Sequence, residues 1–220
     1  MFKKLMLLIL SLILMSCATP ISMEEKCKRA DQYMDMARIA EPTNLDFAIK
    51  HTMEAVKLCP TGLKYAYMAK LDADKGYYDI AVKVAEAALK REPDDASVLT
   101  LVGQTYFKMG KNNEAIPVLG KALLYEPNNA LARNTLATIY LIERDFKKAE
   151  NEFLKNTQNN PQYTISYYML GKLYMDELDD QQKAYEYLSK FIALEKGYSA
   201  ITKDAQERIN NLKVNKNVRQ

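Results

Sequence analysis

The chain has 220 residues, with 31 lysines and arginines against 28 aspartates and glutamates, a single histidine, three cysteines and seven glycines. A formal charge of +3 without a long run of like charge excludes the basic field of a typical nucleic-acid binder. One histidine and few glycines leave little material for a zinc site, a phosphate-binding loop or a histidine-based triad. The composition therefore disfavours most enzyme classes, and we expect neither a cofactor nor a metal.

The first sixteen residues have the pattern of a secretory signal. Two lysines precede residues 5–15, an apolar stretch that is followed by Ser16 and Cys17. This order of charged, apolar and small residues is typical of exported proteins. At about 1.5 Å of rise per residue the stretch covers about 16 Å, which is half of a hydrocarbon core and too short for a permanent span. We therefore expect residues 1–16 to be removed.

The end of this signal, Leu14-Met15-Ser16-Cys17, resembles the lipobox of bacterial lipoproteins. The resemblance implies cleavage before Cys17, a diacylglycerol on its sulfur and a further acyl chain on its new amino group, which together make a stable anchor. Residues 17–22 would form a lipidated tether of at most about 17 Å. The protein would then lie in the bacterial cell envelope, on the periplasmic side of the outer membrane if the host has two membranes. The alternative is an ordinary signal peptide that is cleaved nearby, with Cys17 incidental.

The two remaining cysteines, Cys27 and Cys59, would then lie outside the cytoplasm, where a pair of cysteines commonly forms a disulfide. The capping-box pattern Ser22-x-x-Glu25 predicts a helix over about residues 23–40. Cys27 would lie near the start of that helix and Cys59 at the end of its antiparallel partner, so a bond between them is geometrically feasible. The alternative is two buried apolar thiols.

A 34-residue period organises the rest of the chain. Prolines recur at intervals of 33 or 34 residues, at Pro60, Pro93, Pro127 and Pro161. Small residues keep the same step, at Ala69, Gly103, Ala137 and Gly171. Several columns in one register indicate internal repeats.

Each repeat has the pattern of two helices joined by a turn. In the third repeat the first helical face is formed by Leu99, Val102, Gly103 and Tyr106, and the second by Ala115, Leu119 and Ala122. Between them, Gly110 is a helix stop, and Asn112 and Asn113 are candidate N-caps. The segment 126–129, which contains Pro127, ends this repeat and caps the next one.

These residues resemble the tetratricopeptide repeat (TPR) family. The motif Leu99-x2-Val102-Gly103-x2-Tyr106 matches its consensus, with Leu99 where the family often has tryptophan. The other repeats depart from it, because Asp72 replaces the tyrosine of the second repeat and Arg133 stands in the tryptophan position of the fourth. The resemblance implies an all-α fold, a right-handed superhelical solenoid of five helix-turn-helix repeats at about 28–61, 62–95, 96–129, 130–163 and 164–198.

A polar capping helix is expected to close the C-terminal end of this TPR domain, residues 23–198. Residues 199–213 carry the apolar stripe of such a helix, at Ile201, Ala205, Ile209 and Leu212, and residues 214–220 would form a tail.

In TPR superhelices the first helix of each repeat lines a concave groove, and the resemblance implies three columns of residues there. They are Ala66, Thr100, Asn134 and Tyr168; Lys70, Gln104, Thr138 and Lys172; and Ala73, Phe107, Leu141 and Met175. Leu131, Ile142 and Ile165 add apolar surface. We expect this groove to bind an extended or helical peptide segment. The alternative is that several of these residues pack against the adjoining repeat.

The sequence therefore predicts a non-enzymatic, membrane-anchored TPR adaptor that mediates protein–protein interactions in cell-envelope assembly. Its partners would be protein or peptide segments and the membrane, with no nucleic acid and no small-molecule substrate. A narrower alternative is a pilotin-like role in type IV pilus or secretin assembly, since small TPR lipoproteins include such factors. An alternative of another class is the binding or processing of cell-wall glycan, although only Phe107 and Tyr168 offer aromatic groove surface. His51 has no evident second ligand and is expected at the surface or partly packed.

Overall fold

A computed structural model describes residues 21–195, 197 and 199–218, with side chains as far as Leu212. The predicted signal, Cys17 and most of the predicted tether lie outside the described residues. The described part of the chain forms eleven α-helices and no strand, so the all-α prediction is confirmed. None of these helices is both long and apolar enough to cross a membrane. The helices are α2 (Met23–Ala40), α3 (Leu45–Leu58), α4 (Gly62–Lys75), α5 (Tyr78–Arg91), α6 (Ala96–Lys108), α7 (Asn112–Tyr125), α8 (Ala130–Ile142), α9 (Phe146–Asn159), α10 (Ile165–Asp176), α11 (Gln181–Leu194) and α12 (Ala200–Val218).

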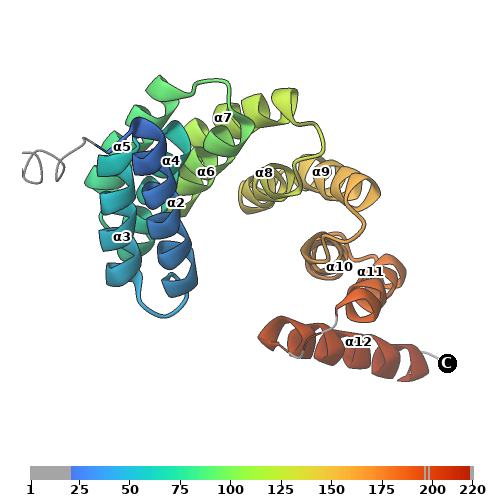
Figure 1. Cartoon of the computed structure of the whole chain (residues 1–220). Coiled ribbons are helices and arrows are strands. Elements are labelled where there is room, and N and C mark those ends of the chain that lie inside the picture. Colours follow the sequence, from blue (N-terminus) through green and yellow to red (C-terminus); the bar gives the residue numbers. More distant parts are fainter. Residues whose placement is uncertain (1–20, 196, 198, 219–220) are drawn as a thin grey trace, which may run out of the picture. The chain divides into compact units, whose positions relative to one another are not determined.

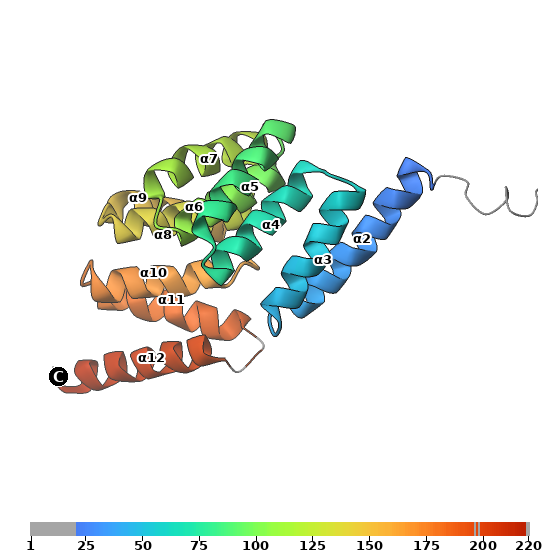
Figure 2. The same ribbon diagram turned by 90° about the vertical axis from the view of Figure 1, so that its left-hand side faces the viewer.

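The described residues divide into two compact units, an N-terminal hairpin that ends at Pro60 and a C-terminal unit that begins at Thr61. The N-terminal hairpin consists of α2 packed against α3 (Figure 1). In the C-terminal unit α4 pairs with α5, α6 with α7, α8 with α9 and α10 with α11, and α12 packs against α11 (Figure 2). Each pair is the helix-turn-helix of one predicted repeat.

The N-terminal hairpin is built on small side chains and a disulfide. The Ser22 hydroxyl caps α2 by accepting a hydrogen bond from the Glu25 N–H at 3.1 Å, and the helix has the predicted bounds. Between the two helices the fully buried residues are Ala30, Ala37, Ala48, Thr52 and Ala55. Cys27 and Cys59 are joined by a disulfide across the open end of the hairpin, with their Cα atoms 4.9 Å apart.

The hairpins of the C-terminal unit require glycine where two helices approach most closely. A Cβ atom on Gly103 of α6 would lie 2.5 Å from Leu119 Cγ of α7. The same substitution at Gly171 of α10 would meet Leu188 Cγ of α11, also at 2.5 Å. The two glycines therefore make room for the leucines that fill the seams, which explains the column of small residues in the sequence.

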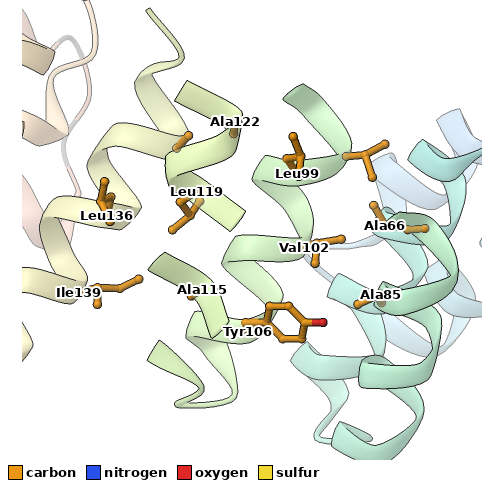
Figure 3. Close-up of a cluster of buried hydrophobic side chains, with 14 residues drawn as sticks. Ala66, Ala85, Leu99, Val102, Tyr106, Ala115, Leu119, Ala122, Leu136 and Ile139 are labelled. Carbon is orange, nitrogen blue, oxygen red and sulfur yellow. The ribbon is translucent and has the colours of Figure 1, made fainter. Parts of the chain in front are cut away.

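The core of the C-terminal unit consists of two apolar clusters that meet at α8. The first joins α4 to α8 and contains the fully buried Val102, Leu119 and Ile139 (Figure 3). The second joins α8 to α12 and contains the fully buried Phe153 and Leu170. Successive repeats therefore share one continuous interior, because the residues of α8 contribute to both clusters.

The turns agree with the sequence at most positions and differ at one. Asn129 caps α8 and Asp180 caps α11, as their positions predict. The prediction that Asn112 or Asn113 caps α7 is wrong, since the helix already begins at Asn112 and the N-cap position belongs to Lys111, which makes no side-chain cap bond. The reason lies in the end of α6, where Gly110 takes a positive φ of 73° and the Lys111 N–H donates to the Tyr106 carbonyl at 2.8 Å. This tight turn brings the start of α7 forward, so that neither asparagine occupies the N-cap position.

Candidate functional site

An apolar groove lies between the first turns of α6 and α8. Its volume is about 380 Å³, which is within the range of ligand pockets and large enough for a few side chains. It is lined by Ser97, Thr100 and Leu101 of α6, by Asn129, Ala130 and Leu131 at the start of α8, and by Tyr163 before α10. We refer to these seven residues as the α6–α8 groove.

The polar groups of the α6–α8 groove are largely engaged in local structure. The Thr100 hydroxyl donates to the Ala96 carbonyl of its own helix at 2.7 Å. Asn129 accepts from the Ala132 N–H at 2.9 Å, and its amide nitrogen donates to Glu126 at 2.9 Å. The surface offered to a ligand is therefore mainly apolar. It includes Leu131, which is 39% exposed.

Tyr163 closes the groove on the side of α10. Burial raises the pKa of its phenol above the ordinary value, so the ring is neutral throughout the physiological range. It therefore adds an aromatic surface without charge.

Two buried polar side chains hold the α8 wall of the groove in place. The fully buried Asn156 of α9 donates to the Ala130 carbonyl at 3.0 Å and to the Ser166 hydroxyl at 2.8 Å. Arg133 donates to the Pro127 carbonyl and to the Glu152 carboxylate. These bonds join the turn before α8 to α9 and α10, so the groove is shaped before any ligand binds.

None of the nine groove residues predicted from the sequence lines the α6–α8 groove. Three of them contact the apolar clusters instead. Phe107 packs against the first cluster, and Leu141 and Met175 pack against the second. For these three, the alternative of packing within the fold describes their surroundings.

Two further predicted residues lie beside α12. The Tyr168 hydroxyl donates to Asp204 at 2.8 Å, and Lys172 places its ammonium 5.7 Å from the centre of the Tyr168 ring. Arg208 of α12 reaches Met175 on the same helix, with its guanidinium 3.7 Å from the Met175 sulfur. Burial, followed by the bond to Asp204, raises the pKa of Tyr168 to about 12. The capping helix thus contacts the surface that α10 was expected to offer to a ligand.

The remaining predicted groove residues make contacts within the C-terminal unit or stay partly exposed. Lys70 pairs with Asp74 at 2.8 Å. Thr138 donates to the carbonyl of Asn134 at 2.8 Å, and the Asn134 side chain accepts from Ser166 at 3.4 Å. Gln104 is partly exposed. Contact of these side chains with a ligand stays a prediction.

Sequence reasoning came close to the α6–α8 groove without assembling it. Thr100 stood in the first predicted column, and Leu131 was noted for its apolar side chain. The residues that were missed are Ser97, Leu101, Asn129, Ala130 and Tyr163. Leu101 and Leu131 carry the only available signal, since both are apolar residues on the predicted polar flank of a first helix.

Family models of the tetratricopeptide repeat match residues 72–137, 106–174 and 165–198, which together cover more than half of the chain. The chain belongs to the tetratricopeptide repeat family. TPR proteins are scaffold-type proteins that bind peptides or other proteins. Its alternating helices and apolar seams are thus those of a known repeat fold.

Individual relatives and solved structures extend this finding. The chain is 30% identical over 103 residues to "Sperm-associated antigen 1" of Mus musculus, a match that covers 47% of this chain and 11% of the relative. It is similar to the crystal structure of TTC0263, a thermophilic TPR protein in Thermus thermophilus, with a TM-score of 0.72, 14% identity and coverage of 82% and 98% of the two chains. It is also similar to PilW, described as a widely conserved type IV pilus biogenesis factor, with a TM-score of 0.68, 17% identity and coverage of 84% and 91%. At these identities the structures share the fold.

Proposed function

We propose that this chain is a lipid-anchored TPR adaptor of the bacterial cell envelope, and that the α6–α8 groove holds a segment of a partner protein. The observation that carries the proposal is an apolar groove with an ordered wall in a family of peptide- and protein-binding scaffolds. An extended or helical segment with two or three apolar anchors fits such a surface. The seven lining residues include no carboxylate, which favours a protein segment over cell-wall glycan.

Photo-crosslinking in cells tests the occupant of the groove. A crosslinking amino acid at Leu131 should capture one specific protein, and the same substitution at Leu124, which is 80% exposed and does not line the groove, should not capture it. Leu101→Glu should abolish the adduct at Leu131, because it places a charge in the apolar groove. Capture of the same protein from both positions, or an adduct that survives Leu101→Glu, would refute this assignment.

The anchor is tested separately at Cys17. Cys17→Ser should prevent incorporation of labelled fatty acid and release the protein from the membrane fraction. Ser16→Ala is the matched control, since it leaves the modified sulfur in place. Labelling that persists in Cys17→Ser would contradict lipidation at this residue.

A role in type IV pilus assembly is the second candidate, supported by the similarity to PilW over most of both chains. Deletion of the gene should then reduce surface piliation, and the wild-type chain should restore it. The Leu101→Glu variant should fail to restore piliation if the α6–α8 groove binds the relevant partner. Normal piliation in the deletion strain would exclude this narrower role.

A further inference from the structure

The C-terminal unit contains an interface that repeats from one hairpin to the next. The second helix of each hairpin covers the first helix of the following one, as α5 covers α6 and α9 covers α10. On the covered helix, the residue before the glycine of the seam is fully buried, as shown by Val102 before Gly103 and Leu170 before Gly171. The residue three positions after the glycine is also buried, as shown by Tyr106.

Helix α2 has the same pattern without such burial. Its fully buried small residue is Ala37, which faces α3 as Gly103 faces α7. Met36, which precedes it, is 43% exposed, whereas Val102 and Leu170 are both 0% exposed. Tyr33 and Ala40, at the other two positions of the pattern, are only partly buried. The hairpin therefore presents, uncovered, a face that is covered elsewhere in the molecule.

Helix α3 extends this face with an aromatic cluster. The His51 ring stacks on Phe47 with 3.8 Å between ring centres and lies 5.8 Å from the Tyr33 ring. Phe47 is 39% exposed. The four residues Tyr33, Met36, Phe47 and His51, which we call the hairpin face, form an apolar and aromatic surface across two helices. The disulfide between Cys27 and Cys59 links these two helices, so the surface is preorganised.

From this geometry we infer that the hairpin face is a self-association surface and that its occupant is the hairpin face of a second copy of the chain. The covering helices of the C-terminal unit show that an apolar helical surface fills this position. A second copy offers such a surface through its own hairpin face. Contact between identical surfaces closes as a two-fold dimer and cannot continue into a filament.

Charge and polarity favour this pairing over a head-to-tail arrangement. The exposed side chains of α12 at the other end of the chain are polar, and they include Lys203, Gln206, Glu207 and Asn210. They offer no apolar counterpart to the hairpin face. The charged residues flanking the hairpin face are paired within their own helix, with Arg29 at 2.9 Å from Glu25 and Lys57 at 2.7 Å from Glu54. Two copies can therefore meet without opposing an excess of like charge.

The inference is tested in cells with two differently tagged copies of the full chain. A photo-crosslinking residue at Met36 in one copy should yield an adduct that carries both tags and has twice the mass of the chain. The same residue at the exposed Leu124 is the matched control and should yield no such adduct. An adduct of Met36 with a different protein, or the absence of a self-adduct, would overturn the inference.

Sedimentation of purified protein supplies a measurement in solution. The wild-type chain should show a concentration-dependent monomer–dimer equilibrium, and Phe47→Glu should weaken it about tenfold or more, because each dimer contains the introduced charge twice. Leu124→Glu should leave the equilibrium unchanged. Circular dichroism and the intact disulfide verify that Phe47→Glu is folded. A wild-type chain that remains monomeric at all concentrations, or a folded Phe47→Glu variant that dimerises as well as wild type, would also overturn the inference.

Discussion

The N-terminal hairpin and the C-terminal unit use the same helix-turn-helix pattern with cores of very different size. One position of the second helix shows this directly, since it holds Thr52 in the hairpin and Leu119, Phe153 and Leu188 in later repeats. All four side chains are fully buried. The C-terminal unit gains stability from large side chains shared between repeats, whereas the hairpin has an alanine-rich seam and a covalent link. Stacked repeats can thus dispense with a cross-link that an isolated hairpin needs.

The largest expected effect comes from removing a large side chain from the C-terminal unit. Phe153→Ala should lower the free energy of unfolding by about 3 to 5 kcal/mol, because it removes a fully buried ring and leaves a cavity. Thr52→Ala is the matched control in the hairpin and should cost about 1 kcal/mol, since the Thr52 hydroxyl only donates to the Ala48 carbonyl of its own helix. Chemical denaturation measures both changes. Equal losses for the two variants would contradict the proposed difference between the cores.

Reduction of the disulfide should affect the other region. On the chain-entropy model the Cys27–Cys59 bond, which closes a sequence separation of 32 residues, stabilises the hairpin by about 3 to 4 kcal/mol. In reduced protein, or in a Cys27→Ala/Cys59→Ala variant, hydrogen exchange should accelerate in α2 and α3. Exchange in α8 and α9 serves as the internal reference and should change little. Uniform acceleration along the chain would show that the two regions unfold as one.

The pH dependence of stability examines a weak position of the C-terminal unit. Asp72 stands where later repeats have Tyr106 and Tyr174. Its side chain is buried, one of its oxygens has no hydrogen-bond partner, and burial raises its pKa to about 6. The folded state therefore binds a proton more tightly than the unfolded state, and stability rises as the pH falls from about 7 to about 4.

The Asp72 contribution is at most about 3 kcal/mol, given about 1.4 kcal/mol per pKa unit. Asp72→Asn should raise stability at pH 7 and remove this part of the pH dependence. Urea denaturation of both proteins at pH 7 and pH 4.5 isolates the effect as a difference between them. Parallel curves for the two proteins would refute the assignment to Asp72.

The smallest expected effects concern helix caps. Ser22→Ala in the hairpin and Asp180→Ala in the C-terminal unit should each cost about 1 kcal/mol, because each removes one acceptor from a helix N-terminus. The two variants differ in where the loss is felt. Hydrogen exchange should show local fraying of α2 in Ser22→Ala and a loss shared with neighbouring repeats in Asp180→Ala. The same local pattern in both would argue that the C-terminal repeats are not coupled.

Much of the fold was predictable because the repeat period amplifies weak local signals. The apolar residues Leu99, Val102 and Tyr106 recur at helical spacing, and each recurrence supports the assignment of the others. The N-cap of α7 was missed because turn geometry depends on how α6 ends, and a single pair of asparagines does not report that. The site was less predictable than the fold. Phe107 and Tyr168 were placed in a groove on helical phase alone, and phase does not tell whether a neighbouring helix already covers a side chain.

The sequence by itself determined the helices, their repeat and the small residues of the seams, because these depend on spacing along one helix and on the size of a side chain. Only the tertiary structure decided which surfaces remain open. It covered Met175 with α12, assembled the α6–α8 groove from three segments, and left Met36 exposed at a position that is buried in later repeats. The physical reason is that exposure depends on neighbours that lie about thirty residues away in the chain, and periodicity within one helix carries no information about them.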